Sequence, residues 1–315
     1  MFPRYSQILK RSFGTNCGAG KTVGFVGLGC MGNPMAANLV SNGFTVKGYD
    51  VVPEARAAAS EAGIRTVETL AECASDVDYV VTALPKTEHV EDALMCQGGI
   101  LENLRSDAYV CDTSTIDPNG AKRFNAEAKK RGLTYIDTPM SGGVTGAKKA
   151  TLTFMVGGTE AEFEHAKGVL QGMGANFFHC GEPGSGEIAK LTNNLILGIS
   201  MVAASEGMAI GEKLGIDPII LQKILSVSTA RCWSIDTMNP RPGVLPDVPS
   251  SNDYKGGFAV GLIAKDMRLA KAAADNANAR TDMLAKSLDY YQQLEDGGKG
   301  GKDFGYVFQY IMNNK

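Results

Sequence analysis

Short apolar runs separated by helical patterns fill the first part of the chain. Each run is four to six residues long and contains β-branched or aromatic residues, which is typical of buried strands. The predicted strands are residues 22–26, 44–49, 78–83, 109–112, 133–136, 151–156 and 176–179, and the predicted helices between them are residues 54–62, 90–95 and 118–130. This alternation predicts an α/β fold with a Rossmann-type, doubly wound and mostly parallel sheet.

The second part of the chain has only helical patterns. Its longest predicted helix, residues 187–213, is uncharged over the fifteen residues from Leu191 to Ser205. That run is shorter than the roughly 20 residues of a membrane span, and Lys190 and Glu206 flank it, so we expect a helix buried between domains or subunits. Shorter helices are predicted at residues 218–225, 262–279, 283–294 and 304–312, and a loop rich in Pro and Gly at residues 239–257. An all-helical C-terminal domain therefore follows the sheet.

A glycine turn joins the first predicted strand to the helix that follows it. Gly27, Gly29 and Gly32 have G-x-G-x-x-G spacing. The first glycine permits a tight turn, the second lets backbone approach a pyrophosphate, and the third lets the helix pack close to the strand. This context predicts an NAD-binding site, and the alternative is an ordinary turn with incidental glycines.

The end of the second predicted strand indicates which dinucleotide is bound. Asp50 stands there, close to the position where an acid binds the adenosine ribose hydroxyls. A 2′-phosphate would meet a like charge at Asp50, and neither Val51 nor Val52 offers a cation to offset it. We therefore expect NAD rather than NADP as the cofactor.

Composition and charge limit the kinds of partner that the protein could bind. The 315 residues carry a net charge of −3, so there is no broad basic field for nucleic acid or for an anionic membrane surface. Seven cysteines contain no C-x-x-C pair and are interpreted as reduced thiols. Three histidines lack a helical ligand spacing, so we expect no metal site. A small-molecule substrate is the remaining expectation.

The amino terminus has the composition of a targeting segment. Residues 1–20 carry Arg4, Lys10 and Arg11 and no acidic residue. This composition predicts a mitochondrial transit peptide and a mature protein in the mitochondrial matrix, and the alternative is a disordered tail of chance composition.

A lysine near the start of the long helix is a candidate general base. Lys190 follows the glycine-rich segment 181–186, and Asn194 lies on the same helical face because the two are four residues apart. The positive end of the helix dipole and partial burial would both lower the pKa of this lysine. A neutral amine could then accept an alcohol proton during hydride transfer. A lysine in a helix is otherwise most often a solvated surface charge.

A second glycine-containing loop is a candidate anion site. Ser141, Gly142 and Gly143 offer a hydroxyl and successive backbone N–H groups, which form a nest for an anion such as a substrate carboxylate. The alternative is a plain turn between a strand and a helix.

Two sequence stretches resemble one known family. GLGCMGNPM at residues 27–35 and RCWSIDTMNPRPGV at residues 231–244 are similar to the 3-hydroxyisobutyrate dehydrogenase branch of the β-hydroxyacid dehydrogenases, and the resemblance extends over residues 23–308. It implies that Lys190 is catalytic, that Asn194 orients the substrate, and that the loop at residues 141–143 grips the substrate carboxylate.

The resemblance also implies further cofactor contacts. The glycine turn contributes Leu28, Cys30 and Met31, and later segments contribute Leu84, Pro85, His89, Thr115 and Lys265. His89 stands where the family often has an asparagine, and Lys265 alternatively forms an interdomain salt bridge. The chain departs from the family at Thr138, Met140 and Ala150, where Ala, Val and Gly are usual, and Met140 could narrow the substrate pocket.

The implied activity is NAD-dependent oxidation of 3-hydroxyisobutyrate to methylmalonate semialdehyde in valine catabolism. The alternatives are a sibling reductase of the tartronate semialdehyde or glyoxylate type and a non-catalytic dinucleotide-binding module, against which Lys190 argues. We expect a transit peptide at residues 1–20, an NAD-binding domain at residues 21–184 and a helical domain at residues 185–315. We also expect a homo-oligomer, either a dimer or a tetramer.

Overall fold

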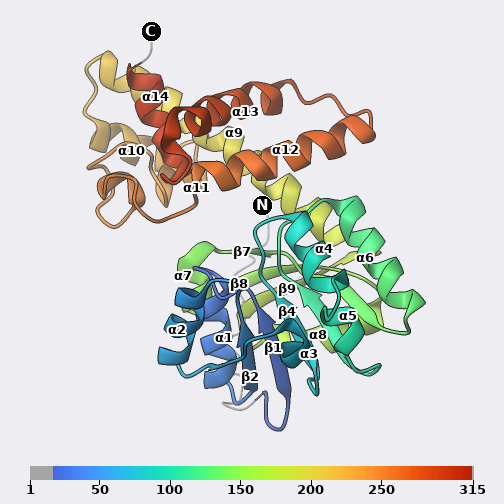
Figure 1. Cartoon of the computed structure of the whole chain (residues 1–315). Coiled ribbons are helices and arrows are strands. Elements are labelled where there is room, and N and C mark those ends of the chain that lie inside the picture. The colour runs from blue at the N-terminus through green and yellow to red at the C-terminus, as the bar shows by residue number, and fades with distance from the viewer. Residues whose placement is uncertain (1–16, 314–315) are drawn as a thin grey trace, which may run out of the picture.

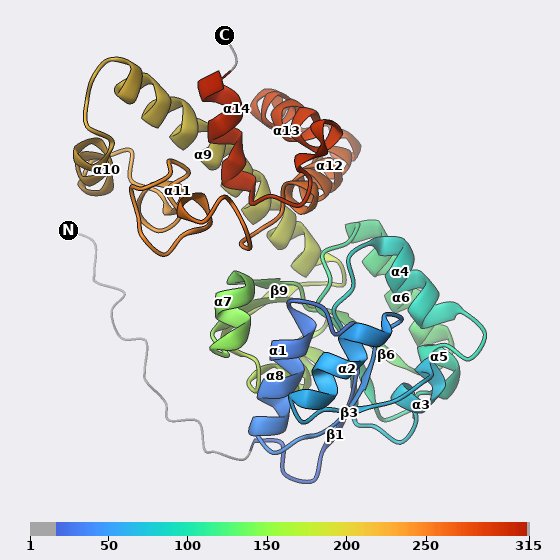
Figure 2. The same ribbon diagram turned by 60° about the vertical axis from the view of Figure 1, so that its left-hand side comes forward.

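The computed structural model describes residues 17–313 and has two parts (Figure 1). One part is a sheet covered by helices, and the other is a group of helices that lies to one side of it. The helix α9 (Ser185–Lys213) begins against the sheet part and runs through the helical part, as two views show (Figures 1 and 2). The predicted transit peptide falls largely on residues 1–16, which lie outside the described residues.

A single nine-stranded sheet forms the first part. Its strand order is β3-β2-β1-β4-β5-β6-β8-β7, and β9 pairs with β8. All pairs are parallel except those that β8 makes with β6 and β7. The chain thus builds outward from β1 in both directions, which confirms the doubly wound, mostly parallel prediction. The strands are β1 (Thr22–Val26), β2 (Thr45–Tyr49), β3 (Arg65–Thr66), β4 (Tyr79–Thr82), β5 (Tyr109–Asp112), β6 (Thr134–Asp137), β7 (Met140–Ser141), β8 (Leu152–Gly157) and β9 (Gly174–Gly181).

Helices cover both faces of this sheet. Phe25 of β1 packs in the core beneath α1 and α8, whereas its neighbour Val26 packs in the core beneath α3, α4, α5 and α6. Successive strand residues point to opposite faces, so a strand covered on both sides is apolar throughout. The helices of this part are α1 (Gly32–Ser41), α2 (Pro53–Glu61), α3 (Leu70–Ala74), α4 (Thr87–Met95), α5 (Ile100–Asn103), α6 (Pro118–Lys130), α7 (Gly143–Lys148) and α8 (Glu160–Leu170).

Local capping explains where several helices begin. Asp117 caps α6 by accepting a hydrogen bond from the N–H of Asn119 at 3.1 Å. The helix α8 was not predicted, although it carries a capping box. Thr159 accepts from the N–H of Glu162, and the Glu162 carboxylate accepts from the N–H of Thr159 at 2.7 Å.

The helical part is organised around α9. Its composition and length alone would suffice to cross a membrane, but half of its most apolar stretch is buried inside the protein. Other helices pack along it and share its apolar core, so we interpret α9 as a core helix. These helices are α10 (Pro218–Val227), α11 (Trp233–Asp236), α12 (Val260–Asn276), α13 (Asp282–Leu294) and α14 (Val307–Asn313), with short turns η1 (Pro249–Ser251), η2 (Glu295–Lys299) and η3 (Phe304–Tyr306).

A buried carboxylate lies in the core of this part. Asp303 is 4% exposed and accepts hydrogen bonds from the N–H groups of Phe258 and Gly305, both at 2.9 Å. Burial raises the pKa of Asp303 from 3.8 to about 6, and the two N–H groups act against that rise. The ionised form is therefore disfavoured in the folded protein relative to the unfolded chain.

The pH dependence of unfolding should report this carboxylate. Because the folded pKa is raised, the contribution of Asp303 to stability is complete below about pH 3.8 and is lost as the pH rises through about 6, by about 3 kcal/mol. Urea unfolding of the parent and of Asp303→Asn between pH 4 and 7 should show that this component disappears in the variant. Asp296→Asn, at an exposed position in η2, is the control and should keep the parent's profile. An identical profile in parent and Asp303→Asn would contradict the assignment.

Candidate active site

The three glycines of the first turn have different surroundings. Gly27 has φ of +96°, and a Cβ on Gly32 would lie 1.8 Å from the carbonyl oxygen of Gly27. The fold therefore needs both glycines, one for its backbone conformation and one for close packing of α1. Gly29 is exposed and has no neighbour within 4 Å of the place where a Cβ would be. Open space at this glycine fits a turn that leaves room for a pyrophosphate.

Asp50 follows β2 and lies beside the same turn. One carboxylate oxygen accepts from the N–H of Leu28 at 2.7 Å, and the other accepts from the N–H of Val52 at 2.8 Å. These bonds hold the carboxylate at the mouth of the glycine turn. Each oxygen retains acceptor capacity for a ribose hydroxyl.

The loops after β4 and β5 are tied together. The buried carboxylate of Asp112 accepts from the hydroxyl groups of Thr82 and Tyr135, at 2.7 and 2.8 Å, and from the N–H of Ser114 at 3.0 Å. Ser114 in turn accepts from the N–H of Leu84 at 2.9 Å. This network fixes the loops that carry several predicted cofactor residues. Leu84 and Thr115 are half-buried, and Pro85 is exposed.

Two other predicted cofactor residues are exposed. Cys30 is exposed in the glycine turn beside half-buried Met31. His89 is exposed on α4, and its ring makes no hydrogen bond to any other residue in the part of the chain that the structure describes. The structure thus places His89 on the surface near the Leu84–Pro85 loop without giving it a partner.

The predicted carboxylate loop lies on the side of the sheet that faces the helical part (Figures 1 and 2). Ser141 ends β7, and Gly142 and Gly143 follow with φ of +134° and +61°. Glycine adopts such angles without strain, and successive N–H groups in this kind of turn can face an anion. Met140 is half-buried beside them.

Ala150 is one of the positions at which the chain departs from the family pattern. It has φ of +51°, a conformation that costs a residue with a Cβ about 1–2 kcal/mol. It lies beyond the end of α7, where Thr151 donates from its N–H to the carbonyl oxygen of Gly146 at 3.0 Å. The alanine therefore affects the way this helix ends and lies outside the carboxylate loop.

Lys190 lies on α9 and is 9% exposed. Its Nζ donates to Oδ1 of Asn194 at 3.2 Å, and Nδ2 of Asn194 donates to Oδ2 of Asp266 at 2.6 Å. Because a carboxylate only accepts, Asp266 orients the amide so that its oxygen faces Lys190. Burial lowers the pKa of Lys190, and the charge of Lys265 adds to this, while Asp266 and Glu187 oppose it.

Lys265 joins this network to the sheet part. Its Nζ lies 3.0 Å from Oδ1 of Asp266 and donates to the carbonyl oxygen of Thr115 at 2.7 Å. Lys265 thus makes a polar link between α12 and the loop after β5. Glu187, which is fully buried on α9, accepts from the N–H of Ile116 in the same loop at 3.1 Å.

The start of α9 is fixed by another buried carboxylate. Asp137 accepts from the N–H of Gly184 at 2.7 Å and from the N–H of Glu187 at 3.2 Å. A Cβ on Gly186 would lie 2.3 Å from the carbonyl oxygen of Met155, so the helix contacts the strand backbone directly. Lys190 therefore lies one turn beyond a helix start that is held against the sheet.

The sequence interpretation did not identify several of these residues. Asp112 and Asp137 each end a strand, so their positions carry a usable signal, because parallel strands bring their carboxyl ends to one edge. Asp266, Glu187 and Arg56 carry no comparable signal in the sequence. Arg56 donates to the backbone carbonyl oxygen of Asp50 at 2.7 Å, so a cation does lie near Asp50.

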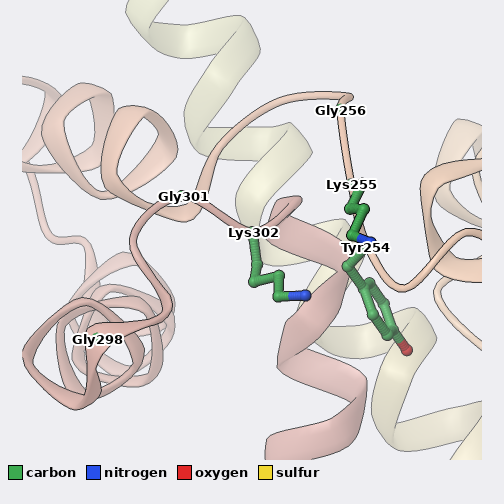
Figure 3. A pocket seen from close by; sticks show the side chains of 6 residues that line it. All are labelled: Tyr254, Lys255, Gly256, Gly298, Gly301 and Lys302. Atoms are coloured by element: carbon green, nitrogen blue, oxygen red, sulfur yellow. The ribbon is translucent and has the colours of Figure 1, made fainter.

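A surface hollow elsewhere lies apart from these residues. It occupies the helical part between the loop after η1 and the turn before η3, and its Lys302 pairs with Asp253 at 2.7 Å. It contains none of the residues described above and is not part of the candidate active site. Its lining residues are Tyr254, Lys255, Gly256, Gly298, Gly301 and Lys302 (Figure 3). Within residues 17–313, no group of three His, Cys, Asp or Glu side chains could hold a metal ion.

The fold and the site define a class of protein. A Rossmann domain and a helical domain that share a buried, hydrogen-bonded lysine are characteristic of an oxidoreductase that uses a nicotinamide dinucleotide. A family profile described as the NAD binding domain of 6-phosphogluconate dehydrogenase matches residues 22–181. A second, described as NAD-binding of NADP-dependent 3-hydroxyisobutyrate dehydrogenase, matches residues 184–311.

Comparison with individual relatives identifies the family. The mitochondrial 3-hydroxyisobutyrate dehydrogenase of Mus musculus is 44% identical over 300 residues, which cover 94% of this chain and 89% of the relative. That of Drosophila melanogaster is 40% identical over 318 residues, covering 100% and 96%. The structure of 3-hydroxyisobutyrate dehydrogenase from Mycobacterium tuberculosis with L-serine superposes with a TM-score of 0.86, at 35% identity, over 92% of this chain and 99% of that one. The chain belongs to the 3-hydroxyisobutyrate dehydrogenase family.

The different surroundings of Gly29 and Gly32 give a test of the glycine turn. Gly32→Ala should lower the free energy of unfolding by about 1–3 kcal/mol, because its Cβ would overlap the Gly27 carbonyl. Gly29→Ala should leave the melting temperature nearly unchanged and raise the Kd for NAD by about tenfold or more, about 1.4 kcal/mol. Thermal unfolding and calorimetric titration measure the two effects. A Gly29→Ala variant that binds NAD normally would remove this glycine from the cofactor site.

Proposed function

We propose that this protein oxidises 3-hydroxyisobutyrate to methylmalonate semialdehyde with NAD, a step of valine catabolism. The observation that carries the proposal is Lys190, a buried amine held by Asn194 on the first turns of α9. The family relatives named for this reaction support it. The bound nicotinamide dinucleotide supplies the hydride acceptor.

We assign the proton transfer to Lys190. In its neutral form the amine donates one hydrogen to Asn194, which leaves its lone pair free to accept the proton of the substrate hydroxyl. The ammonium group that forms is stabilised by the amide oxygen of Asn194 and by the charge of Asp266. Burial favours the neutral form before the reaction, and the charges of Asp266 and Glu187 oppose it.

We assign substrate and cofactor binding to the loops at the sheet edge. Ser141, Gly142 and Gly143 would hold the substrate carboxylate, and half-buried Met140 would limit the size of the group beside it. The glycine turn at residues 27–32, together with Asp50, would hold the dinucleotide. Leu84, Pro85, His89, Thr115 and Lys265 remain proposed cofactor contacts.

We further propose a homo-oligomer in the mitochondrial matrix. Large apolar side chains on α10 and at the end of α9 are exposed, including Ile210, Leu214, Ile220 and Val227. Exposed apolar side chains of this kind favour burial against another chain, and multi-angle light scattering of the purified protein tests the oligomer.

The mitochondrial relatives and the basic segment at residues 1–20 support the location in the mitochondrial matrix. The amino-terminal sequence of native protein, expected to begin within residues 12–22, tests this location.

Substrate preference tests the central proposal. Among short hydroxyacids, 3-hydroxyisobutyrate should give the highest kcat/KM with NAD, ahead of glycerate and glycolate, the alcohols that correspond to tartronate semialdehyde and glyoxylate. Steady-state oxidation across this panel measures the preference. A higher kcat/KM for glycerate or glycolate would favour a sibling enzyme, and binding of NAD without turnover of any of them would favour a non-catalytic module.

Replacement of Lys190 tests the proton transfer. Lys190→Met should lower kcat by a factor of about 10² to 10⁴, which is typical of a lost general base, while NAD still binds. In the parent, kcat/KM for oxidation should rise with pH through one ionisation below the ordinary lysine value of about 10.4, because only the neutral amine accepts a proton. That limb should vanish in the variant. Lys213→Met, at the exposed end of the same helix, is the control. Near-normal turnover of Lys190→Met with the parent's pH profile would exclude this mechanism.

Replacement of Asp50 tests the cofactor preference. The unmodified enzyme should use NAD in strong preference to NADP, since the carboxylate accepts ribose hydroxyls and repels a 2′-phosphate. Asp50→Ala should weaken NAD use and narrow the preference. The ratio of kcat/KM for NAD to that for NADP measures the change. Equal kcat/KM values for the two cofactors in the unmodified enzyme would count against the proposal.

A further inference from the structure

A guanidinium group lies beside Asp50 and is held by two oxygen atoms. Arg56 is in the first turn of α2. One of its terminal nitrogens donates to the backbone carbonyl oxygen of Asp50 at 2.7 Å, and the other pairs with Oε2 of Glu68 at 3.0 Å. The Arg56 side chain is 19% exposed, whereas that of Glu68 is 79% exposed. The cation near the proposed ribose site is thus already engaged within the protein.

The backbone of Glu68 is anchored opposite α2. The strand β3 pairs with β2, and the N–H of Val67 donates to the carbonyl oxygen of Gly48 at 3.0 Å. Val67 is buried, with 2% exposure. Glu68 follows directly, so the sheet edge fixes the point from which its side chain reaches Arg56.

The two valines that follow Asp50 offer nothing to a phosphate. Both carboxylate oxygens are fixed by backbone N–H groups, so the negative charge stays in place. Val51 and Val52 are exposed and apolar. A 2′-phosphate at this position would need a cation, and a planar guanidinium is well suited to bind it through two hydrogen bonds. Of the residues described around Asp50 in this subsection, Arg56 is the one that could supply this cation.

We infer that Glu68 is a specificity-determining residue that disfavours NADP by holding Arg56 against the backbone of Asp50. It acts through Arg56 and is therefore a positioning residue. The inference rests on the proposed preference for NAD and adds a second cause to the charge of Asp50. When Glu68 loses its charge, Arg56 keeps its bond to the Asp50 carbonyl and gains a free edge that can turn toward a phosphate.

The test compares dinucleotide binding by charge-neutral variants. Calorimetric titration of the full chain with NAD and with NADP gives the ratio of the two Kd values without depending on turnover. Glu68→Gln should lower the Kd for NADP relative to NAD by about two- to fivefold, the size expected when an exposed ion pair is released. The matched control is Glu72→Gln, which removes the same charge from a nearby exposed residue whose partner Arg65 lies 4.0 Å away. It should leave the ratio unchanged.

A double variant separates two explanations. Removing the charge of Glu68 also removes a direct repulsion of the phosphate, which needs no arginine. In Arg56→Gln/Glu68→Gln the gain for NADP should disappear if Arg56 is responsible. A gain that persists in the double variant overturns the inference, as does a Glu68→Gln ratio equal to that of Glu72→Gln. Unmodified protein that binds NADP as tightly as NAD would instead refute the proposed cofactor preference.

Discussion

The contact between the first turn of α9 and the edge of the sheet determines the position of the proposed base. Asp137 lies where β6 meets β8, and its carboxylate accepts from two N–H groups at the start of α9. A carboxylate at this end of a helix is favoured by the helix dipole and by the unpaired N–H groups. There is no room for a Cβ on Gly157 or on Gly186, because it would lie 2.5 or 2.8 Å, respectively, from a carboxylate oxygen of Asp137. Lys190 is one turn further along α9, so the fixed start of the helix determines where Lys190 lies.

The amide of Asn194 separates Lys190 from a carboxylate, and this separation affects the charge of the amine. A lysine paired directly with Asp266 would be held in its charged form, because an opposite charge at close range favours ionisation. With the amide between them, Lys190 keeps a hydrogen-bond partner while burial lowers its pKa. Asp266 is paired instead with Lys265, so its own charge is compensated. The network thus keeps Lys190 hydrogen-bonded to Asn194 and still permits a neutral amine.

Features set by neighbouring residues could be predicted from the sequence, and features set by distant contacts could not. The glycine turn, the Asp117 cap of α6 and the alternation of strands and helices are local, and the structure has them. The capping box of α8 is also local, because Thr159 and Glu162 stand three positions apart in the sequence. In contrast, β3 and β7 have two residues each and exist only through pairing with β2 and β8.

The site shows the same division. Lys190 and Asn194 could be linked by their spacing, but the role of Asp137 depends on its bonds to residues 47 and 50 positions later. Val51 and Val52 directly follow Asp50 in the sequence, and neither carries a cation. Arg56 lies six positions beyond Asp50 and returns to it because α2 turns the chain back, a geometry that spacing alone does not give.

Two adjacent residues connect the proposed base with the cofactor side of the site. Thr115 accepts a hydrogen bond from Lys265 of α12, and Ile116 donates one to Glu187 of α9. Both residues belong to the loop after β5, which the Asp112 network also fixes to the loop after β4. Because transfer rates fall steeply when reacting groups are misplaced by about 1 Å, a loop held from the sheet and from both helices suits a reaction in which a proton and a hydride leave the substrate toward different groups. The interdomain hydrogen bonds therefore hold the helices that carry Lys190 and Lys265 in place relative to this loop.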